Sequence, residues 1–505
     1  MSEKVLVYGT GARDHCLADE YIESAHVGKV YFAPGNPGIE YTRKGRRKLI
    51  ERIPIRDFSE IARFCKDNKV SLVDVGSENP LDEGLVDVLN AAGIPTVGPR
   101  REYARLENDR AFTDDLLTSI GVPKPAYRVF DAPEEAKKYV RRVGYQVVVK
   151  ANGLAAGKGA IVCDDVDDAE AAIDAIMVKK KFGKSGDRVV VEARKYGTEI
   201  SFFAYLDGKN VLPLNMFAQD YKPAFDPDQK VDMFYFNYGY GTDGIRRGLE
   251  ELRIKPPENL DFANKNERED YLASVLSDAE LQTFNTGGTG CYCPHKLVSP
   301  WLANRIIEEI VNPTVTAVYE DLGWKYKGVL YFGLNLDPYG KLDVFEINVR
   351  HGDPEAQVIL RKLQTDLFEI GMATWNGTLD QIKPEWNKNY YVDVIAMMGR
   401  SRADKGGWYQ GYPGRYGEGY RITGLENLEN KTLDRGVAVF FSGVDLHPER
   451  GLVTKGGRVL HVVASDSSVE TAAQKAYRNI QKFAFLDHNN ENQNCMRFRR
   501  TIGSL

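Results

Sequence analysis

The segment VVVKANGLAAGKGAIVC, from Val147 to Cys163, sets a small-residue loop between two apolar runs. Backbone N–H groups in such a glycine-rich turn can surround phosphate oxygens, and the loop's lysines add positive charge. A P-loop needs four residues between its glycines, then Lys followed by Ser or Thr, and it leads from a strand into a helix. Here only three residues lie between Gly153 and Gly157, Lys158 is followed by Gly159, and the flanks predict two strands. The segment therefore predicts a glycine hairpin over phosphates, with a purely structural hairpin as the alternative.

The residues around this hairpin predict a small α/β unit. Between residues 126 and 192 the pattern reads strand, helix, strand, loop, strand, helix, strand. The two prolines of VPKPAYRVF precede it and mark a boundary, because proline is typical of connections.

A second polar pattern lies in LDVFEINVRHGDPEAQ. Residues i and i+2 of a strand point to one face, so Glu346 and Asn348 offer a carboxylate and an amide oxygen together, which are hard ligands that suit Mg²⁺. Arg350 continues that face and suits a carboxylate or phosphate. The alternative is a solvated strand face with a salt bridge, and the glycine hairpin makes the metal reading the stronger one. Both segments are expected to face one triphosphate.

The first hundred residues alternate strands with helices, which predicts a parallel, doubly wound sheet. Its first loop, GTGARDH, offers a helix N-terminus for a single phosphate group, with Arg13 nearby. Asp14 stands where a dinucleotide fingerprint wants its third glycine, and no acidic residue ends the second strand, so an NAD site is not favoured.

The composition is that of a folded globular protein of three or four domains, with 43% hydrophobic and 28% charged residues in 505. A net charge of -5 without a basic stripe argues against a nucleic-acid partner. No apolar run suits a signal core or a membrane span, and six scattered cysteines suit a reducing compartment, so a cytoplasmic location is expected.

Taken in order, the segments KANGLAAGKG, RVVVEA and FEINVRHGDPE resemble ATP-grasp ligases. Within them the chain is most similar to the phosphoribosylamine–glycine ligases, through VLVYGTGARDH, APGNPGI, NTGGTG, GYPGRY, GLVTKGGRVL and FRRTIG. This resemblance covers nearly the whole chain. It implies an enzyme that joins glycine to 5-phosphoribosylamine through a glycyl phosphate, using ATP with Mg²⁺ or Mn²⁺, in de novo purine biosynthesis.

The resemblance also implies an α/β fold, with α+β character in the ATP-grasp part. An N-terminal substrate domain would span residues 1–105, and an ATP-grasp domain 106–384. The latter would contain a lid subdomain at about 124–193 and an insertion at about 223–283. A strand-rich α+β domain would complete the chain at 385–505, as a monomer or homodimer.

The implied site residues fall into three groups. Glu346 and Asn348 would hold the metal, and Arg350 and Lys158 would act on the transferred phosphoryl group. ATP would be held by Arg110, Lys150, Gly153, Gly157, Lys158, Gly159, Glu192 and Glu199. The substrates would be held by Gly9, Gly11, Arg13, Glu78, Asp220, Lys222, Asn285, Thr286, Gly287, Gly288, Arg350 and Asp353.

The chain departs from the family pattern at several places. The hinge reads EARKYG, with Arg194 and Lys195 near the expected adenine, and the insertion at 223–283 is long. A lid extension or a subunit contact would explain that insertion, and a plain structural role is favoured. Cys291, Cys293 and His295 alternate along a strand, but without a clear fourth ligand, buried thiols are favoured over zinc.

Three other functions stay open at this stage. One is a related ligase with a different carboxylate or amine, and another is a nucleotide-binding scaffold without turnover. The third is a nicotinamide-dependent oxidoreductase.

Overall fold

The computed structural model describes residues 2–42, 50–155, 157–226, 228–238, 242–257, 260–262, 264–276, 285–403, 407–487 and 490–503. It begins with a five-stranded parallel sheet in the order β3-β2-β1-β4-β5. The strands are β1 (Glu3–Gly9), β2 (Val27–Pro34), β3 (Ile50–Arg52), β4 (Leu72–Val75) and β5 (Thr96–Val97). The helices are α1 (Ala12–Glu23), α2 (Ile39–Thr42), α3 (Phe58–Asn68), α4 (Glu78–Glu83) and α5 (Leu85–Ala91).

Alternate residues of β1 enter two different cores. Val5 and Val7 pack with residues of α1, whereas Leu6 and Tyr8 pack with residues of α3 and α5. Successive strand side chains point to opposite faces, so both faces of this sheet are covered. The predicted doubly wound parallel sheet is confirmed.

The lid is a four-stranded antiparallel sheet in the order β6-β9-β7-β8. Its strands are β6 (Tyr127–Phe130), β7 (Val147–Ala151), β8 (Ala160–Val162) and β9 (Val189–Ala193), and helices α8 (Pro133–Val140) and α9 (Val166–Ile173) pack on it. The glycine loop joins β7 to β8, so the predicted strand-to-strand hairpin is confirmed.

One long antiparallel sheet runs through the rest of the molecule in the order β14-β13-β10-β11-β12-β15-β22-β19, with β25 beside β15. Its first strands are β10 (Thr198–Asp207), β11 (Val211–Asp220), β12 (Gly290–Cys293), β13 (Lys327–Leu336) and β14 (Leu342–Asn348). The others are β15 (Tyr390–Met398), β19 (Val437–Phe441), β22 (Arg458–Asp466) and β25 (Met496–Arg497). Because β12 pairs with β15, the ATP-grasp part and the C-terminal part share this sheet.

Several helices connect and cover these sheets. They are α6 (Arg105–Asn108), α7 (Arg110–Ser119), α13 (Pro300–Ile306), α14 (Asn312–Thr316), α15 (Glu355–Lys362), α16 (Leu367–Asn376), α17 (Glu426–Glu429) and α18 (Val469–Ile480). A smaller C-terminal sheet holds β18 (Arg421–Thr423), β20 (Val444–His447), β21 (Gly451–Thr454), β23 (Ala484–Asp487) and β24 (Asn490–Asn494). Strands β16 (Ser401–Arg402) and β17 (Trp408–Tyr409) form a separate pair.

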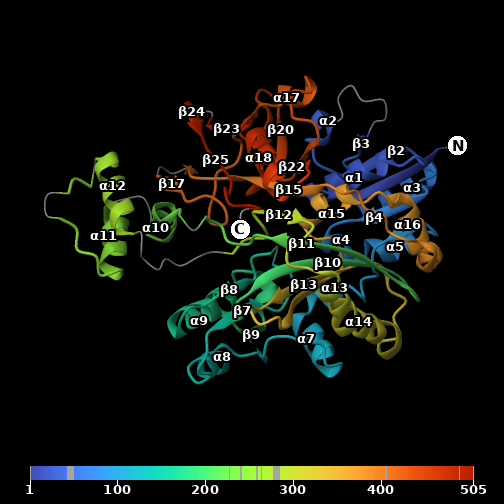
Figure 1. The fold of residues 1–505 in the computed structure, drawn as a ribbon, viewed down its shortest axis with the longest axis horizontal. Helices are drawn as coiled ribbons and strands as arrows, with labels where there is room; N and C mark the ends of the chain where they lie inside the picture. Colours follow the sequence, from blue (N-terminus) through green and yellow to red (C-terminus); the bar gives the residue numbers. More distant parts are fainter. Residues whose placement is uncertain are drawn as a thin grey trace.

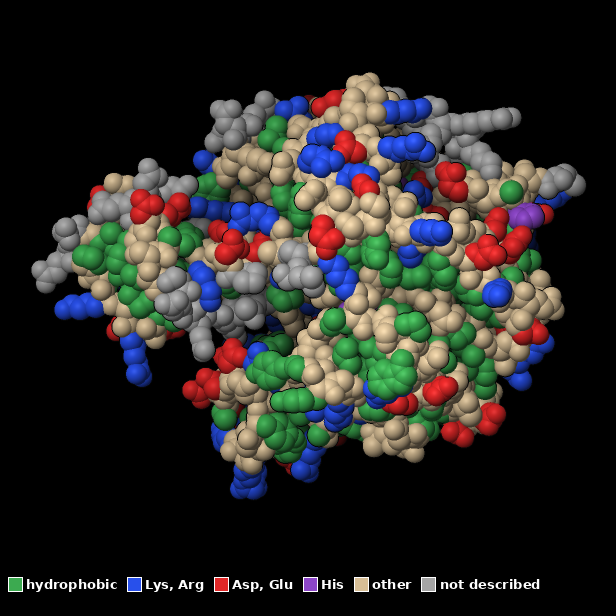
Figure 2. Space-filling model, in the orientation of Figure 1, with side chains coloured by type: hydrophobic (Ala, Val, Ile, Leu, Met, Phe, Trp, Pro, Cys, Tyr) green, Lys and Arg blue, Asp and Glu red, His purple; other side chains and the backbone are tan. Residues whose placement is uncertain are grey.

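The predicted insertion contains helices α10 (Lys230–Tyr238), α11 (Thr242–Glu251) and α12 (Lys265–Val275). They share a small apolar core that includes Phe234, Ile245 and Leu272. Figure 1 shows α11 and α12 at the left, with α10 between them and the rest of the molecule, and Figure 2 shows the unit as a lobe beside the main body. On the face seen in Figure 2, basic and acidic side chains are interspersed. Within the described residues, no helix is long and apolar enough to cross a membrane.

Candidate active site

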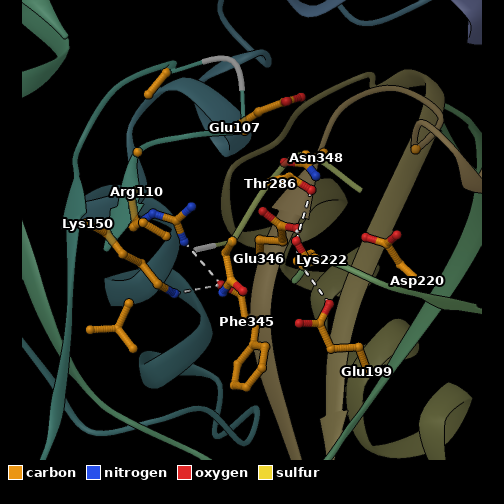
Figure 3. Close-up of a pocket in the computed structure, with 18 of the residues that line it drawn as sticks. Glu107, Arg110, Lys150, Glu199, Asp220, Lys222, Thr286, Phe345, Glu346 and Asn348 are labelled. Carbon is orange, nitrogen blue, oxygen red and sulfur yellow. Dashed lines mark hydrogen bonds and ion pairs between the residues drawn. The ribbon is translucent and has the colours of Figure 1, made fainter. Parts of the chain in front are cut away.

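A cavity of about 390 Å³ lies between the lid and the long sheet, and Figure 3 shows part of its lining. Both the glycine hairpin after β7 and the polar residues of β14 open onto it. The predicted site residues that line it are Glu78, Arg110, Lys150, Gly153, Gly157, Gly159, Glu192, Glu199, Asp220, Lys222, Asn285, Thr286, Gly287, Glu346, Asn348, Arg350 and Asp353. Two segments almost two hundred residues apart therefore meet at one cavity, as the sequence predicted.

Two basic side chains, Lys150 and Arg110, contact the backbone of strand β14. The Nζ atom of Lys150 lies 2.5 Å from Glu192 Oε2 and 3.3 Å from the carbonyl oxygen of Phe345. Arg110 Nη1 donates to the same carbonyl at 3.1 Å. Burial lowers the pKa of Lys150, and the nearby Glu192 carboxylate opposes that shift. In Figure 3 both cations approach Glu346 from one side of the cavity, where they can meet phosphate oxygens.

The hinge residues after β9, numbers 193–197, also line this cavity. Arg194, one of the two basic residues that depart from the family pattern, pairs with Asp164. Lys195 lies 3.7 Å from Asp343 Oδ2 on β14. Both charges therefore have acidic partners.

Strand β14 presents Glu346 and Asn348, the predicted metal ligands, to the cavity on alternate positions. Lys222 Nζ lies 3.2 Å from Glu346 Oε1 and 3.1 Å from Glu199 Oε2, and Figure 3 shows it between the two carboxylates. Burial opposes ionisation of Glu346, but the charges of Lys222, Arg110 and other bases outweigh it and lower its pKa to about 2.

These observations fit a hard divalent cation. A carboxylate held in its ionised form stands beside an amide oxygen, and a lysine ammonium already demonstrates that the site attracts positive charge. Within the described residues, no group of three or more His, Cys, Asp or Glu side chains could hold a metal. The predicted ligand pair uses one carboxylate and one amide, which is the kind of set Mg²⁺ takes together with substrate phosphates.

Arg350 lies between two carboxylates from the N-terminal part. Its Nη2 lies 2.8 Å from Glu107 Oε1, and its Nε lies 3.5 Å from Glu78 Oε2. Arg13 Nη2 reaches the same Glu78 oxygen at 3.3 Å. Burial opposes ionisation of Glu78, but the charges of Arg350 and Arg13 outweigh it and lower its pKa to about 2. Burial raises the pKa of Glu107 to about 7, although Arg350 works against that shift.

The floor of the cavity is acidic. Asp220, at the end of β11, is buried, and its Oδ1 has no hydrogen-bond partner among the residues that the structure describes. Burial, and then the nearby Glu355, raise the pKa of Asp220 well above its ordinary value. A methyl group at Gly288 would lie 2.9 Å from Asp220 Oδ1 and 2.5 Å from Pro354 Cδ, so only glycine fits there. A carboxylate aimed into a cavity without a partner suits an incoming ammonium group.

Five predicted site residues do not line the cavity: Gly9, Gly11, Arg13, Lys158 and Gly288. The N–H groups of Thr10 and Gly11 donate to Asp14 Oδ2 at 2.9 and 2.8 Å, so these two donors of the first loop are already engaged. Lys158 Nζ lies over the Tyr412 ring, 5.2 Å from its centroid. Burial, and then the neighbouring Arg458, lower the pKa of Lys158. The roles of these five residues stay predictions, as do the roles of the predicted residues that line the cavity.

The glycine hairpin touches the segment that would hold glycine. Gly157 has a φ of 73°, and a methyl group there would lie 3.0 Å from the Cα atom of Gly287. Arg458 Nη1, from β22, donates to the carbonyl oxygens of Gly287 and Asp353, both at 2.8 Å. The C-terminal part therefore supports the segment on which the lid rests.

Sequence reasoning missed several residues of this cavity. Glu107, Tyr331, Phe345 and Glu355 line it, and Arg458 supports it. Glu355 Oε1 accepts hydrogen bonds from Ser201 and Tyr331, at 2.8 and 3.0 Å. Its position as the glutamate of the HGDPE turn was a usable signal, whereas Glu107 stands in a charged helical run that looks like a solvated surface.

The cysteine pair is not at this cavity. Cys291 and Cys293 are free, buried thiols, and both belong to an apolar core. His295 Nε2 lies 3.2 Å from the carbonyl oxygen of Glu199. Burial raises the pKa of both thiols, so the prediction of buried thiols is confirmed.

Three family models match the chain. They are the N domain of phosphoribosylglycinamide synthetase at residues 3–107, its ATP-grasp (A) domain at 108–356, and its C domain at 409–504. A phosphoribosylamine–glycine ligase of Archaeoglobus fulgidus is 39% identical over 99% of this chain and 99% of its own. One of Caldanaerobacter subterraneus is 34% identical over 95% of this chain and 97% of its own.

Solved structures show the same fold. The crystal structure of phosphoribosylamine–glycine ligase from Thermotoga maritima has a TM-score of 0.69, with 24% identity, and covers 99% of this chain and 100% of its own. The biotin carboxylase domain of Hydrogenobacter thermophilus 2-oxoglutarate carboxylase, solved with MgADP and bicarbonate, has a TM-score of 0.56. It is 15% identical and covers 96% of this chain and 91% of its own.

Proposed function

The chain belongs to the phosphoribosylamine–glycine ligase family of ATP-grasp enzymes, and from that premise we propose how its residues divide the work of the reaction. The enzyme joins glycine to 5-phosphoribosylamine in purine biosynthesis. The γ-phosphoryl group of ATP passes to a glycine carboxylate oxygen and leaves ADP. The amine nitrogen then attacks the acyl carbon, phosphate leaves, and the nitrogen loses one proton as the amide forms.

The ATP phosphates bind between the glycine hairpin and the basic side chains of Arg110 and Lys150. Glu346 and Asn348 hold Mg²⁺, which neutralises phosphate charge when it is bound, and Mn²⁺ suits the same oxygen ligands. Lys222 lies between Glu346 and Glu199, so its ammonium group is placed to stabilise negative charge that develops on the phosphates. Catalysis here is positioning and electrostatic stabilisation, because phosphoryl transfer needs no protein nucleophile.

Glycine binds on the acidic floor. Its carboxylate meets Arg350 beside the 285–287 segment, and its ammonium group meets Asp220, whose Oδ1 has no other hydrogen-bond partner among the described residues. Burial raises the pKa of Asp220, and the positive charge of the ammonium group acts against that shift by favouring the ionised carboxylate.

The amine substrate binds on the N-terminal side. Glu78 and Arg350 lie there, and the loop containing Gly9, Gly11 and Arg13 closes that end of the site. Closure of the lid hairpin over Gly287 then protects the acyl phosphate from water.

One observation carries this proposal: the glycine hairpin, Glu346 and Arg350 all line one cavity. The test is ADP release with 5-phosphoribosylamine generated in place from ribose 5-phosphate and ammonia. We expect release to require both glycine and a divalent cation. Release with another carboxylic acid but not with glycine would contradict the assigned substrate.

The proposal also covers oligomeric state, metal preference and location in the cell. The enzyme works as a monomer or homodimer, accepts Mn²⁺ in place of Mg²⁺, and resides in the cytoplasm. Light scattering and a metal titration of ADP release test the first two.

A further inference from the structure

A polar cluster lies between the long sheet and helix α15, outside the cavity. His461 on β22, Asp393 on β15 and Gln357 on α15 are each 0% exposed. Their neighbours on the strands, Ile395 and Val463, belong to apolar cores. Burying ionisable groups in such a layer costs free energy that well-packed apolar side chains would not, so the cluster calls for an explanation.

The histidine bridges two acids. His461 Nδ1 lies 2.7 Å from Asp393 Oδ2. On the other side of the ring, His461 Nε2 lies 3.7 Å from Asp353 Oδ1 and has no hydrogen-bond partner among the residues that the structure describes. The ring is fully buried, so Asp393 fixes its orientation, and this orientation aims Nε2 at Asp353.

Asp353 is the one member of this chain of contacts that lines the cavity. Gln357 Nε2 donates to its Oδ1 at 2.9 Å, and Arg458 Nη2 lies 3.5 Å from its Oδ2. Burial opposes its ionisation, but the charges of Arg458 and His461 outweigh that effect and lower the pKa of Asp353 well below its usual range. The carboxylate is therefore a fixed acceptor rather than a proton carrier.

The position of Asp353 indicates which substrate it faces. A methyl group at Gly11, in the first loop, would lie 3.6 Å from Asp353 Oδ2. This end of the cavity is the one assigned to the amine substrate, whose ribose carries hydroxyl groups. An ionised carboxylate is the acceptor that commonly binds ribose hydroxyls.

We propose that His461 and Asp393 form a positioning pair that holds the Asp353 carboxylate in place for the ribose hydroxyls of the amine substrate. The proposal rests on the function assigned above. Neither member of the pair touches substrate, and both act through Asp353.

Two substitutions of His461 distinguish the contribution of Nδ1 from that of Nε2. An Asn side chain in His461→Asn can replace Nδ1 and keep the Asp393 contact, but it cannot reach Asp353. A Gln side chain in His461→Gln places its amide near the position of Nε2. We expect His461→Asn to raise the KM for 5-phosphoribosylamine and the Kd for ribose 5-phosphate about tenfold. Loss of a residue that orients a ligand-binding side chain has an effect of about this size. His461→Gln should restore most of the affinity, and the KM values for ATP and glycine should stay within about twofold.

A double-mutant cycle supplies the control. In an Asp353→Asn background, His461→Asn should add no further loss, because the pair acts only through that carboxylate. Asp393→Asn is a second variant with the same shape as the native side chain, and calorimetric binding of ribose 5-phosphate reads its effect without turnover. Thermal unfolding checks that each variant is folded.

Two outcomes would overturn the proposal. One is an unchanged ribose 5-phosphate Kd in both His461→Asn and Asp393→Asn, and the other is an equal rise of all three KM values. Failure of the wild-type chain to form product from glycine would instead contradict the function itself, so the two failures are distinguishable.

Discussion

At the scale of single residues, the site consists of charged side chains that shift one another's pKa values. Lys222 lies between Glu199 and Glu346, and Arg350 lies between Glu78 and Glu107. Glu78 and Glu346, whose pKa values are lowered to about 2, each have a base within ion-pair distance. We expect these pairs to exchange partners when phosphates and metal bind, because each charge would then face a new opposite charge.

Glu346→Gln tests the metal site. The amide keeps the shape of the side chain but loses its charge, so ADP release should fall about 100-fold or more, and half-saturation should need more Mg²⁺. The measurement is a Mg²⁺ titration of ADP release. Glu309→Gln is a matched control, because that glutamate pairs with Arg305 on a helix surface, and it should leave the titration unchanged. An unchanged Mg²⁺ requirement in Glu346→Gln would exclude Glu346 as a ligand.

Asp74 on β4 gives a prediction about pH and stability. It is buried beside Tyr21, whose hydroxyl donates to it at 2.7 Å, and burial raises its pKa from 3.8 to about 7. The folded state therefore holds a proton that the unfolded state loses between pH 4 and 7, so stability falls as pH rises through that range. Asp74→Asn should remove this contribution, worth up to about 4 kcal/mol by linkage.

The measurement is urea unfolding of Asp74→Asn and wild type at pH 5 and pH 8. The variant should gain stability relative to wild type as the pH rises. A difference that does not change with pH would show that Asp74 titrates normally.

At the scale of elements, the lid hairpin and the segment at residues 285–288 meet through two glycines. Gly157 has a φ of 73°, which favours glycine, and it lies so close to Gly287 that a Cβ atom would be crowded. Both its backbone conformation and its packing therefore favour glycine. This contact lies at the tip of the strand pair β7–β8, where small motions of the lid have the largest effect on the cavity.

Gly157→Ala separates the two requirements when it is compared with Gly144→Ala. Gly144 also has a φ of 73°, but a methyl group there would meet nothing within 4 Å. Each variant should lose about 1 kcal/mol of stability from the strained backbone. Only Gly157→Ala should also lower kcat, about tenfold or more, because the added methyl group holds the lid away from Gly287. Equal turnover in the two variants would contradict lid contact as part of the reaction.

The elements also show what sequence can and cannot predict. The glycine hairpin, the β13–β14 hairpin and the doubly wound sheet follow from patterns within about thirty residues, so they were predictable. Glu107 was not, because its function depends on Arg350, which lies far along the chain. Arg458 was missed for the same reason, since nothing near it in sequence indicates that it reaches Gly287.

At the scale of the whole molecule, the insertion and the C-terminal segment are tied together. Asp226, at the root of the insertion, is buried and accepts hydrogen bonds from the N–H groups of Arg500 and Thr501, at 2.8 and 3.1 Å. It also accepts from Thr501 Oγ1 at 2.6 Å and lies 3.4 Å from Arg499 Nε. Figure 1 shows the C-terminus at the centre of the view, near β12.

Asp226→Ala should therefore loosen the site from a distance. The change removes the acceptor of two partly buried N–H groups, which costs about 1 kcal/mol or more. Hydrogen exchange should quicken at residues 220–226 and 285–289, and the KM for glycine should rise. Asp228→Asn is the control, because that side chain is 73% exposed and pairs only with the exposed Arg500 among the described residues. Unchanged exchange in Asp226→Ala would show that the C-terminal segment does not support the site.

Pro223 and Asn285 form an antiparallel bridge, so the chain leaves the body of the enzyme and returns to it at adjacent points. The residues that follow Asp226 and precede Asn285 can lengthen, shorten or be exchanged for a foreign module without moving the two flanking strands apart, provided that the Asp226 contacts are kept. The same bridge is thus a natural splice point, at which a reporter protein could be grafted within a few residues of the glycine pocket.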